Sequence, residues 1–176
     1  IEKEWRAQII SFVIKFGRPD HLDSHHHVHL LPRIFALFIT LAGELQIPVR
    51  MPITPDLIPE VEELGDFKGL GNRITSEMLA EDIKIIQYSG VRFPDYFMEN
   101  FLPAVNEKTE LLRKTISNFP VGTTELMCHP AYVDDNLRQI SHYAEERDVE
   151  RKSLEHKEFY KLLSDYGIDL VRYNKI

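Results

Sequence analysis

The sequence contains a single cysteine, Cys128, among 176 residues, and it lacks several features that define large classes of protein. One cysteine excludes an internal disulfide framework and suits a reducing compartment, so we expect a cytoplasmic protein. No apolar run is long enough to cross a bilayer, and we therefore expect no membrane partner. Lysine and arginine form no stripe and the formal net charge is −7, which argues against a nucleic-acid partner.

The sequence also lacks a glycine-rich phosphate loop, a serine nucleophile elbow and a Cys-x-x-Cys pair. What it has instead is a cluster of histidines: five of the eight lie between His21 and His29. Imidazole binds divalent metals and transfers protons near neutral pH. This segment is therefore the first candidate for a functional site.

We predict a strand over residues 21–29. At the two-residue period of a strand, one face carries an imidazole or a carboxylate at every position: His21, Asp23, His25, His27 and His29. Such a face has no packing rationale, which favours a metal site or a catalytic site. The alternative is that single histidines only bind the backbone or line a polar rim. His26 would point to the other face and is expected to be structural.

A second candidate is His129, which follows a predicted strand over residues 123–128 and precedes Pro130. A histidine held at a strand end by proline is suited to general acid or base chemistry, although an exposed loop histidine gives the same pattern. Cys128 alternates with Leu126 and is expected to be an inert core thiol. Arg50 follows a short apolar strand and is a candidate for orienting a carboxylate or binding an anionic substrate group, with an ordinary ion pair as the alternative.

The chain alternates helical and strand patterns, and we predict one α/β domain over residues 1–176 with a mostly parallel sheet, open or barrel-shaped. Because ligands gather at the carboxyl ends of such strands, the histidine segment and His129 would face one pocket. Helices are expected over residues 5–16, 34–45, 76–89, 105–116, 140–152 and 159–166. Further strands are expected over residues 47–51 and 168–173, and residues 91–103 are expected to be irregular or to form a short strand.

Taken together, these segments resemble the YdjC-like carbohydrate deacetylases, the chitooligosaccharide deacetylase family. The similar stretches are His21–His29, Leu31–Phe35, Glu125–Ala131, Tyr143, Arg147 and Gly167–Leu170. The resemblance implies a distorted (β/α) barrel, present here in part. It also implies removal of acetyl groups from N-acetylglucosamine units of a small oligosaccharide, with a divalent ion, Mg²⁺ or Zn²⁺, as cofactor.

The resemblance also implies roles for individual residues. His25 would be a metal ligand, and His129 would be the catalytic proton donor to the leaving amine. Asp23 would be a catalytic residue that supports the metal shell, and His27 would line the substrate pocket. Arg50 stays a candidate for substrate binding.

Two family motifs do not occur in this sequence: an opening Asn-Ala-Asp-Asp-Phe-Gly strand and a later Gly-x-His-Leu strand, which supply the catalytic aspartate and other metal ligands. We therefore expect a C-terminal part of a longer barrel, inactive or nearly so alone, with exposed sheet edges that favour a homo-oligomer. The alternatives are an amidohydrolase-type metal-dependent hydrolase and a non-catalytic metal-binding domain.

Overall fold

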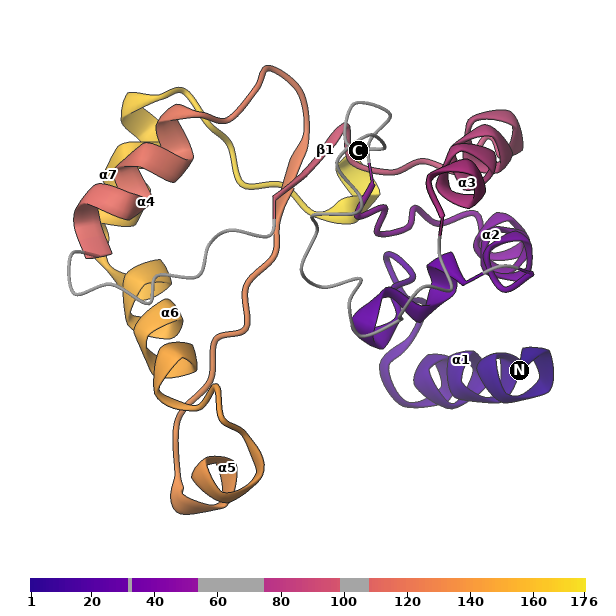
Figure 1. The fold of residues 1–176 in the computed structure, drawn as a ribbon, viewed down its shortest axis with the longest axis horizontal. Helices are drawn as coiled ribbons and strands as arrows, with labels where there is room; N and C mark the ends of the chain where they lie inside the picture. Colours follow the sequence, from indigo (N-terminus) through magenta and orange to yellow (C-terminus); the bar gives the residue numbers. More distant parts are fainter. Residues whose placement is uncertain (32, 54–74, 99–107) are drawn as a thin grey trace. The chain divides into compact units, whose positions relative to one another are not determined.

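The computed structural model describes residues 1–31, 33–53, 75–98 and 108–176, and these residues form two compact units (Figure 1). Unit 1 comprises residues 1–95 and 171–176, and unit 2 comprises residues 96–170. The single domain expected over residues 1–176 stays a prediction.

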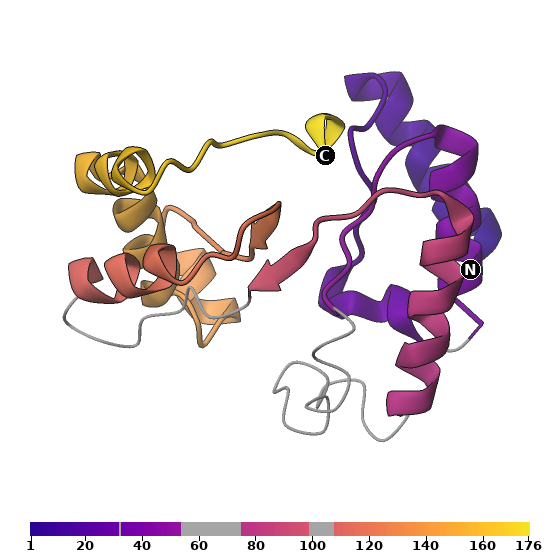
Figure 2. The same ribbon diagram turned by 90° about the horizontal axis from the view of Figure 1, so that it is seen from above.

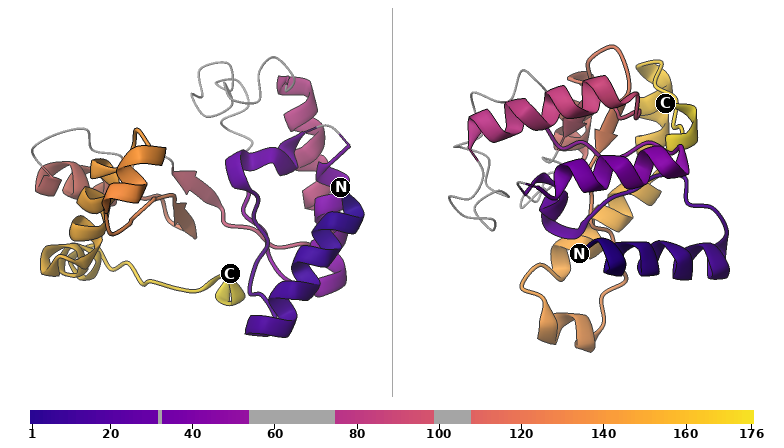
Figure 3. Two further views of the ribbon diagram at one scale, coloured as in Figure 1. Left: turned by 90° about the horizontal axis from the view of Figure 1, so that it is seen from below. Right: turned by 90° about the vertical axis from the view of Figure 1, so that its right-hand side faces the viewer.

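Three α-helices form most of unit 1, and all three follow the apolar periodicity of the sequence. They are α1 (Glu2–Phe16), α2 (Phe35–Leu45) and α3 (Ser76–Ser89). Helices α2 and α3 lie side by side (Figure 3). Their buried faces and the extended segments beside them form the core of unit 1: Leu30, Phe35, Phe38, Ile39, Ala42, Val49, Met51, Ile53, Leu79, Ile83 and Ile86.

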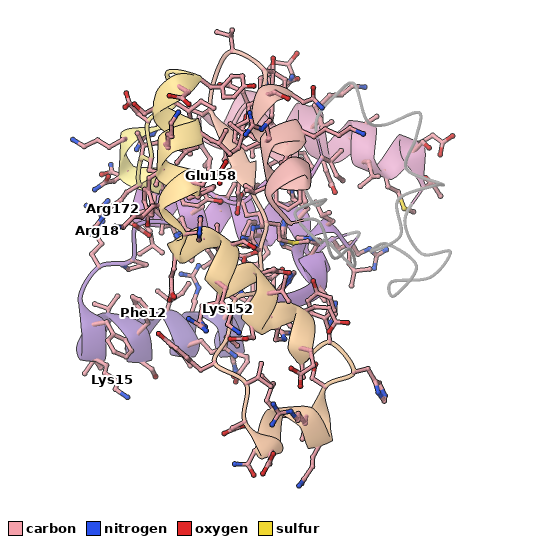
Figure 4. All side chains as sticks on the ribbon, turned by 90° about the vertical axis from the view of Figure 1, so that its left-hand side faces the viewer. Phe12, Lys15, Arg18, Lys152, Glu158 and Arg172 are labelled. Atoms are coloured by element: carbon pink, nitrogen blue, oxygen red, sulfur yellow. The ribbon has the colours of Figure 1, made fainter. Side chains whose placement is uncertain are left out.

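Helix α1 is attached to α2 by few contacts. The Trp5 ring meets the Phe38 ring edge-to-face at 5.9 Å between centroids, and Arg6 forms an ion pair with Glu44 at 2.6 Å. No residue of α1 is buried. Its remaining apolar side chains are largely exposed, and Phe12 projects from the helix as Figure 4 shows.

The strand predicted over residues 21–29 is wrong. Leu22 forms a single parallel bridge with Val49, and residues His25–Leu30 then form the 3₁₀ helix η1. His26 and His27 have φ of 51° and 52°, in the left-handed region that an extended strand does not contain. The predicted face of alternating imidazoles therefore does not exist.

The strand predicted over residues 47–51 is reduced to its centre. The Leu22 N–H donates to the Pro48 carbonyl, and the Arg50 N–H donates to the Leu22 carbonyl, both at 3.0 Å. On the other side the Val49 N–H donates to the Arg92 carbonyl at 3.0 Å. Backbone hydrogen bonds thus join three short extended segments of unit 1, around Leu22, Val49 and Arg92.

The described residues of unit 2 form a two-stranded parallel sheet and four helices. Strand β1 (Tyr96–Met98) pairs with β2 (Thr124–Leu126), with Phe97 opposite Glu125; Figure 2 shows both strands as short arrows. The short strand expected within residues 91–103 and the strand over residues 123–128 are thereby confirmed over these spans. The helices are α4 (Lys108–Ser117), α5 (Asp135–Ile140), α6 (Glu145–Glu155) and α7 (Lys157–Asp165).

Helices α4 and α7 lie side by side over a small apolar core (Figure 1). This core is formed by Ile116, Phe159, Leu162 and Leu163, with Leu126, Cys128, Leu154 and Ile168 packed against it. Half-buried Cys128 thus lies against the core, as expected. The fold of the described residues is therefore α/β with a small parallel sheet.

Two predictions for unit 2 and the chain end need correction. The helix expected over residues 140–152 is observed as α6, shifted to Glu145–Glu155, and a separate short helix that was not predicted, α5, ends at Ile140 before it. The strand expected over residues 168–173 does not form; instead the 3₁₀ helix η4 covers Tyr173–Lys175. No helix of the described residues is both long enough and apolar enough to cross a membrane.

Candidate functional site

Ser24 is the reason that the histidine segment turns instead of extending. Its hydroxyl oxygen accepts the backbone N–H of His29 at 3.0 Å and is hydrogen-bonded to Nδ1 of the same imidazole at 2.6 Å. Side-chain to backbone bonds of this kind compete with a strand ladder. The segment therefore closes into a compact turn, and its imidazoles point in different directions.

His29 is the fully buried end of this turn. Its ring stacks on the Phe38 ring of α2 at 4.4 Å between centroids. Burial, with smaller contributions from His27 and Arg50, lowers the pKa of His29 from 6.5 to about 3. The imidazole is therefore neutral at physiological pH, and it anchors the turn to the core of unit 1.

Asp23 and Arg50 lie beside the turn as a half-exposed ion pair. Arg50 Nη1 donates to Asp23 Oδ2 at 2.7 Å, and the Ser24 N–H donates to Asp23 Oδ1 at 2.6 Å. The carboxylate predicted to support a metal shell is thus oriented by a guanidinium, the ordinary ion pair considered for Arg50. A substrate contact by Arg50 and a catalytic role for Asp23 stay predictions.

The other two predicted residues of this segment differ in exposure. His25 is exposed, and its ring meets the His26 ring at 4.2 Å between centroids. His27 is buried, with its ring perpendicular to the His29 ring at 6.1 Å. Across the described ranges, no group of three or more His, Cys, Asp or Glu side chains is arranged to hold a metal ion.

His129 lies in unit 2, just beyond β2, and its backbone is bound on both sides by α6. The His129 N–H donates to Glu150 Oε2, and the His129 carbonyl accepts from Arg147 Nη1 at 3.2 Å. The imidazole ring lies perpendicular to the Tyr143 ring at 6.3 Å. The histidine is half-buried, so its ring is both held in place and partly accessible.

Glu150 is a fully buried carboxylate that binds two donors. Besides the His129 N–H it accepts the Tyr143 hydroxyl at Oε1, at 2.6 Å. Burial, followed by the bond to Glu150, raises the pKa of Tyr143, so the phenol keeps its proton and remains the donor. The buried charge is therefore satisfied by hydrogen bonds, as buried carboxylates require.

The sequence pattern does not single out Glu150, because a mixture of acidic and basic residues such as that from Glu145 to Lys157 predicts a solvated helix face. That expectation is wrong for Glu150 and for Ser153, which are both buried. A usable signal was present: Arg147 and Glu150 are three residues apart and so share one face of a helix. Tyr143 lies two residues before α6 begins, and its hydroxyl reaches Glu150.

Comparisons with known proteins give consistent matches. A model of the family described as YdjC-like protein matches residues 1–165. A carbohydrate deacetylase of Clostridium beijerinckii is 28% identical over 100% of this chain and 61% of its own length. One from Thermoanaerobacter pseudethanolicus is 33% identical over 88% of this chain and 51% of its own length.

A solved structure has a similar fold. The crystal structure of a candidate cellobiose-phosphate cleavage protein from Enterococcus faecalis V583 has a TM-score of 0.73 and 29% identity, covering 99% of this chain and 59% of that one. This chain therefore spans between about half and three fifths of the length of these relatives.

Proposed function

Because the chain belongs to the YdjC-like protein family, we propose that it acts in a carbohydrate deacetylase, hydrolysing the acetamide of N-acetylglucosamine units in chitooligosaccharides. The distorted (β/α) barrel belongs to this proposal, with the described residues contributing part of it. So does the cytoplasmic location expected from the single cysteine.

The observation that carries the proposal is the way His129 is held at the end of a parallel strand, with its backbone fixed and its ring half-buried. Hydrolysis breaks the C–N bond of the acetamide and releases acetate and an amine. The leaving nitrogen needs a proton as that bond breaks, and a positioned imidazolium supplies one. His129 is the residue of this chain that we assign to that proton transfer.

The proposed divalent ion, Mg²⁺ or Zn²⁺, does not fit the described residues alone. His25 is exposed next to His26, and Asp23 is bound to Arg50, so these ranges provide no enclosed ligand set. A metal at His25 would need ligands beyond the described residues. We therefore derive no step through the ion, and we expect the 176-residue chain alone to be inactive or nearly so.

The test is acetate release from N,N′-diacetylchitobiose by the protein at its full natural length. His129→Ala should lower kcat by roughly 10²–10⁴, the usual loss when a proton-transferring group is removed. His142→Ala is the matched control, because this histidine is exposed and lies in the same unit. Far-UV circular dichroism checks that both variants fold.

Equal activity of the parent and the folded His129→Ala variant would contradict the assignment of the proton donor. An inactive parent that nevertheless binds a divalent ion would favour the non-catalytic metal-binding domain over the deacetylase. Hydrolysis of other amides with no action on acetylated sugars would favour the amidohydrolase alternative.

A further inference from the structure

Both backbone polar groups of His129, the N–H and the carbonyl, are hydrogen-bonded to side chains of helix α6. Glu150 accepts its N–H, and Arg147 donates to its carbonyl at 3.2 Å. Two residues further on, the Ala131 N–H donates to the Arg147 carbonyl at 3.2 Å. The backbone on both sides of the His129 Cα is therefore held by α6, which fixes the direction in which the side chain leaves the chain.

Burying the Glu150 carboxylate costs free energy, which suggests that the residue has a role beyond filling space. A fully buried carboxylate loses its hydration, and an apolar residue of similar volume would fill the same space at no such cost. The charge instead binds two donors, and both lead to His129. One donor is the His129 N–H itself, and the other is the hydroxyl of Tyr143, whose ring lies against the imidazole.

Arg147 fixes the same pair from the other side. Its guanidinium lies over the Tyr143 ring at 5.6 Å from the centroid while Nη1 binds the His129 carbonyl. Tyr143 is thus held at its hydroxyl by Glu150 and at its ring face by Arg147. Because the Tyr143 ring is held at both places, it restricts the positions that the neighbouring His129 imidazole can take.

We propose that Tyr143, Arg147 and Glu150 are positioning residues that fix the orientation of the His129 imidazole for proton transfer. This inference rests on the proposed function, since orientation matters only if His129 transfers a proton. Misplacement of a reacting group by about 1 Å can lower a rate by about a hundredfold. The three residues would therefore act on kcat and hardly at all on substrate binding.

The experiment compares Glu150→Gln with Glu150→Ala in the protein at its full natural length. Gln can accept the His129 N–H and donate to the Tyr143 oxygen, so it preserves the geometry without the charge. We expect Ala to lower kcat about tenfold to a hundredfold with KM changed less than about threefold, and Gln to recover most of that loss. Glu155→Gln is the control, because Glu155 is exposed on the same helix and binds Arg151.

A second measurement does not depend on activity. In NMR spectra of the folded variants, loss of Glu150 should move the resonance of the His129 amide proton upfield, because its hydrogen bond is lost. It should also alter the Hα–Hβ couplings that report the orientation of the His129 side chain. The same changes should be absent in Glu155→Gln. If Glu150→Ala is unfolded, the comparison of Glu150→Gln with Tyr143→Phe provides both readouts.

The outcomes separate the two ideas. Unchanged His129 couplings together with a parental kcat in the folded Glu150 variants would overturn the positioning role. A kcat that falls only in proportion to the fraction of unfolded protein would also overturn it, because that is a purely structural effect. A parent without deacetylase activity would overturn the proposed function, and the spectra would then decide whether α6 orients His129.

Discussion

At the scale of single residues, His29 makes the clearest prediction, because it is fully buried and neutral in the folded chain. Its pKa is lowered from 6.5 to about 3 by burial, with smaller effects from His27 and Arg50. Below about pH 6.5 the unfolded chain binds a proton at this residue and the folded chain does not. The free energy of unfolding should therefore decrease as the pH is lowered below about 6.5, by at most ~1.4 kcal/mol per pH unit from this group.

His29→Phe should make this dependence flatter, because Phe keeps the stacking on Phe38 but has no proton to bind. Between about pH 6.5 and pH 5 the parent should lose about 2 kcal/mol more than the variant. Urea unfolding at several pH values measures the difference. The exposed His142→Gln serves as the control, and parallel pH curves for the parent and His29→Phe would show that His29 is not the source.

The sequence predicts a side chain's role well where that side chain binds residues close to it along the chain. Asp134 lies in a turn-prone segment of the sequence, where aspartate is typical of a helix cap, and its Oδ1 accepts the Leu137 N–H at 2.8 Å. The ion pair of Asp23 with Arg50 joins residues 27 positions apart, and the sequence offered it only as one of several alternatives for Arg50. A contact of that kind depends on which extended segments meet, and local spacing does not encode this.

At the scale of elements, helix α3 carries a buried carboxylate, Asp82, whose Oδ2 has no hydrogen-bond partner among the described residues. Burial, and then the charge of Glu81, raises the pKa of Asp82 from 3.8 to about 7. As the pH rises above 3.8, the unfolded chain releases this proton while the folded chain keeps it up to about 7. Asp82 therefore reduces stability progressively as the pH rises through this range.

Asp82→Asn should stabilise the protein at neutral pH by about 1–2 kcal/mol, after allowance for partial screening by solvent. The gain should shrink as the pH approaches 4, where the carboxyl is protonated in both states. Glu81→Gln should give only a small part of it, because it removes a neighbouring charge and leaves Asp82 in place. Chemical denaturation at neutral and acidic pH tests this, and a variant less stable than the parent at both would contradict it.

Elements with a long apolar period could be predicted from the sequence, and those fixed by side-chain hydrogen bonds could not. The periods of α1, α2 and α3 gave these helices almost to their ends. The histidine segment has the alternation of a strand, but the Ser24 hydroxyl binds His29 and turns the chain. At the second candidate site the sequence predicted His129, which stands out before a proline. It did not predict the buried Glu150, which lies in a stretch of charged residues.

At the scale of the whole molecule, the exposed apolar side chains of α1 bear on the expected homo-oligomer. Ile10 is 58% exposed, Ile14 82% and Phe16 67%. Exposed apolar side chains promote association in water, and we expect a second copy of the chain to cover those of α1. Sedimentation velocity should show a dimer that grows with protein concentration.

The variant Ile14→Glu should shift this equilibrium toward the monomer, because it places a charge in the middle of the α1 surface. Val121→Glu is a matched control, since Val121 is fully exposed in unit 2 and away from α1 in the sequence. A parent that stays monomeric at all concentrations would contradict the homo-oligomer. Equal weakening by both variants would contradict the assignment to α1.

Metal affinity is also a property of the whole molecule, because a divalent ion needs several ligands from different segments at once. In the part of the chain that the structure describes, His25 is exposed, and no three His, Cys, Asp or Glu side chains are grouped to hold an ion. One histidine cannot enclose an ion, so Zn²⁺ and Mg²⁺ should bind the 176-residue chain more weakly than about micromolar. Isothermal titration calorimetry measures this, with His25→Ala and His26→Ala as paired variants. One-to-one binding at micromolar affinity or tighter, lost in His25→Ala and kept in His26→Ala, would show that this chain completes a metal site by itself.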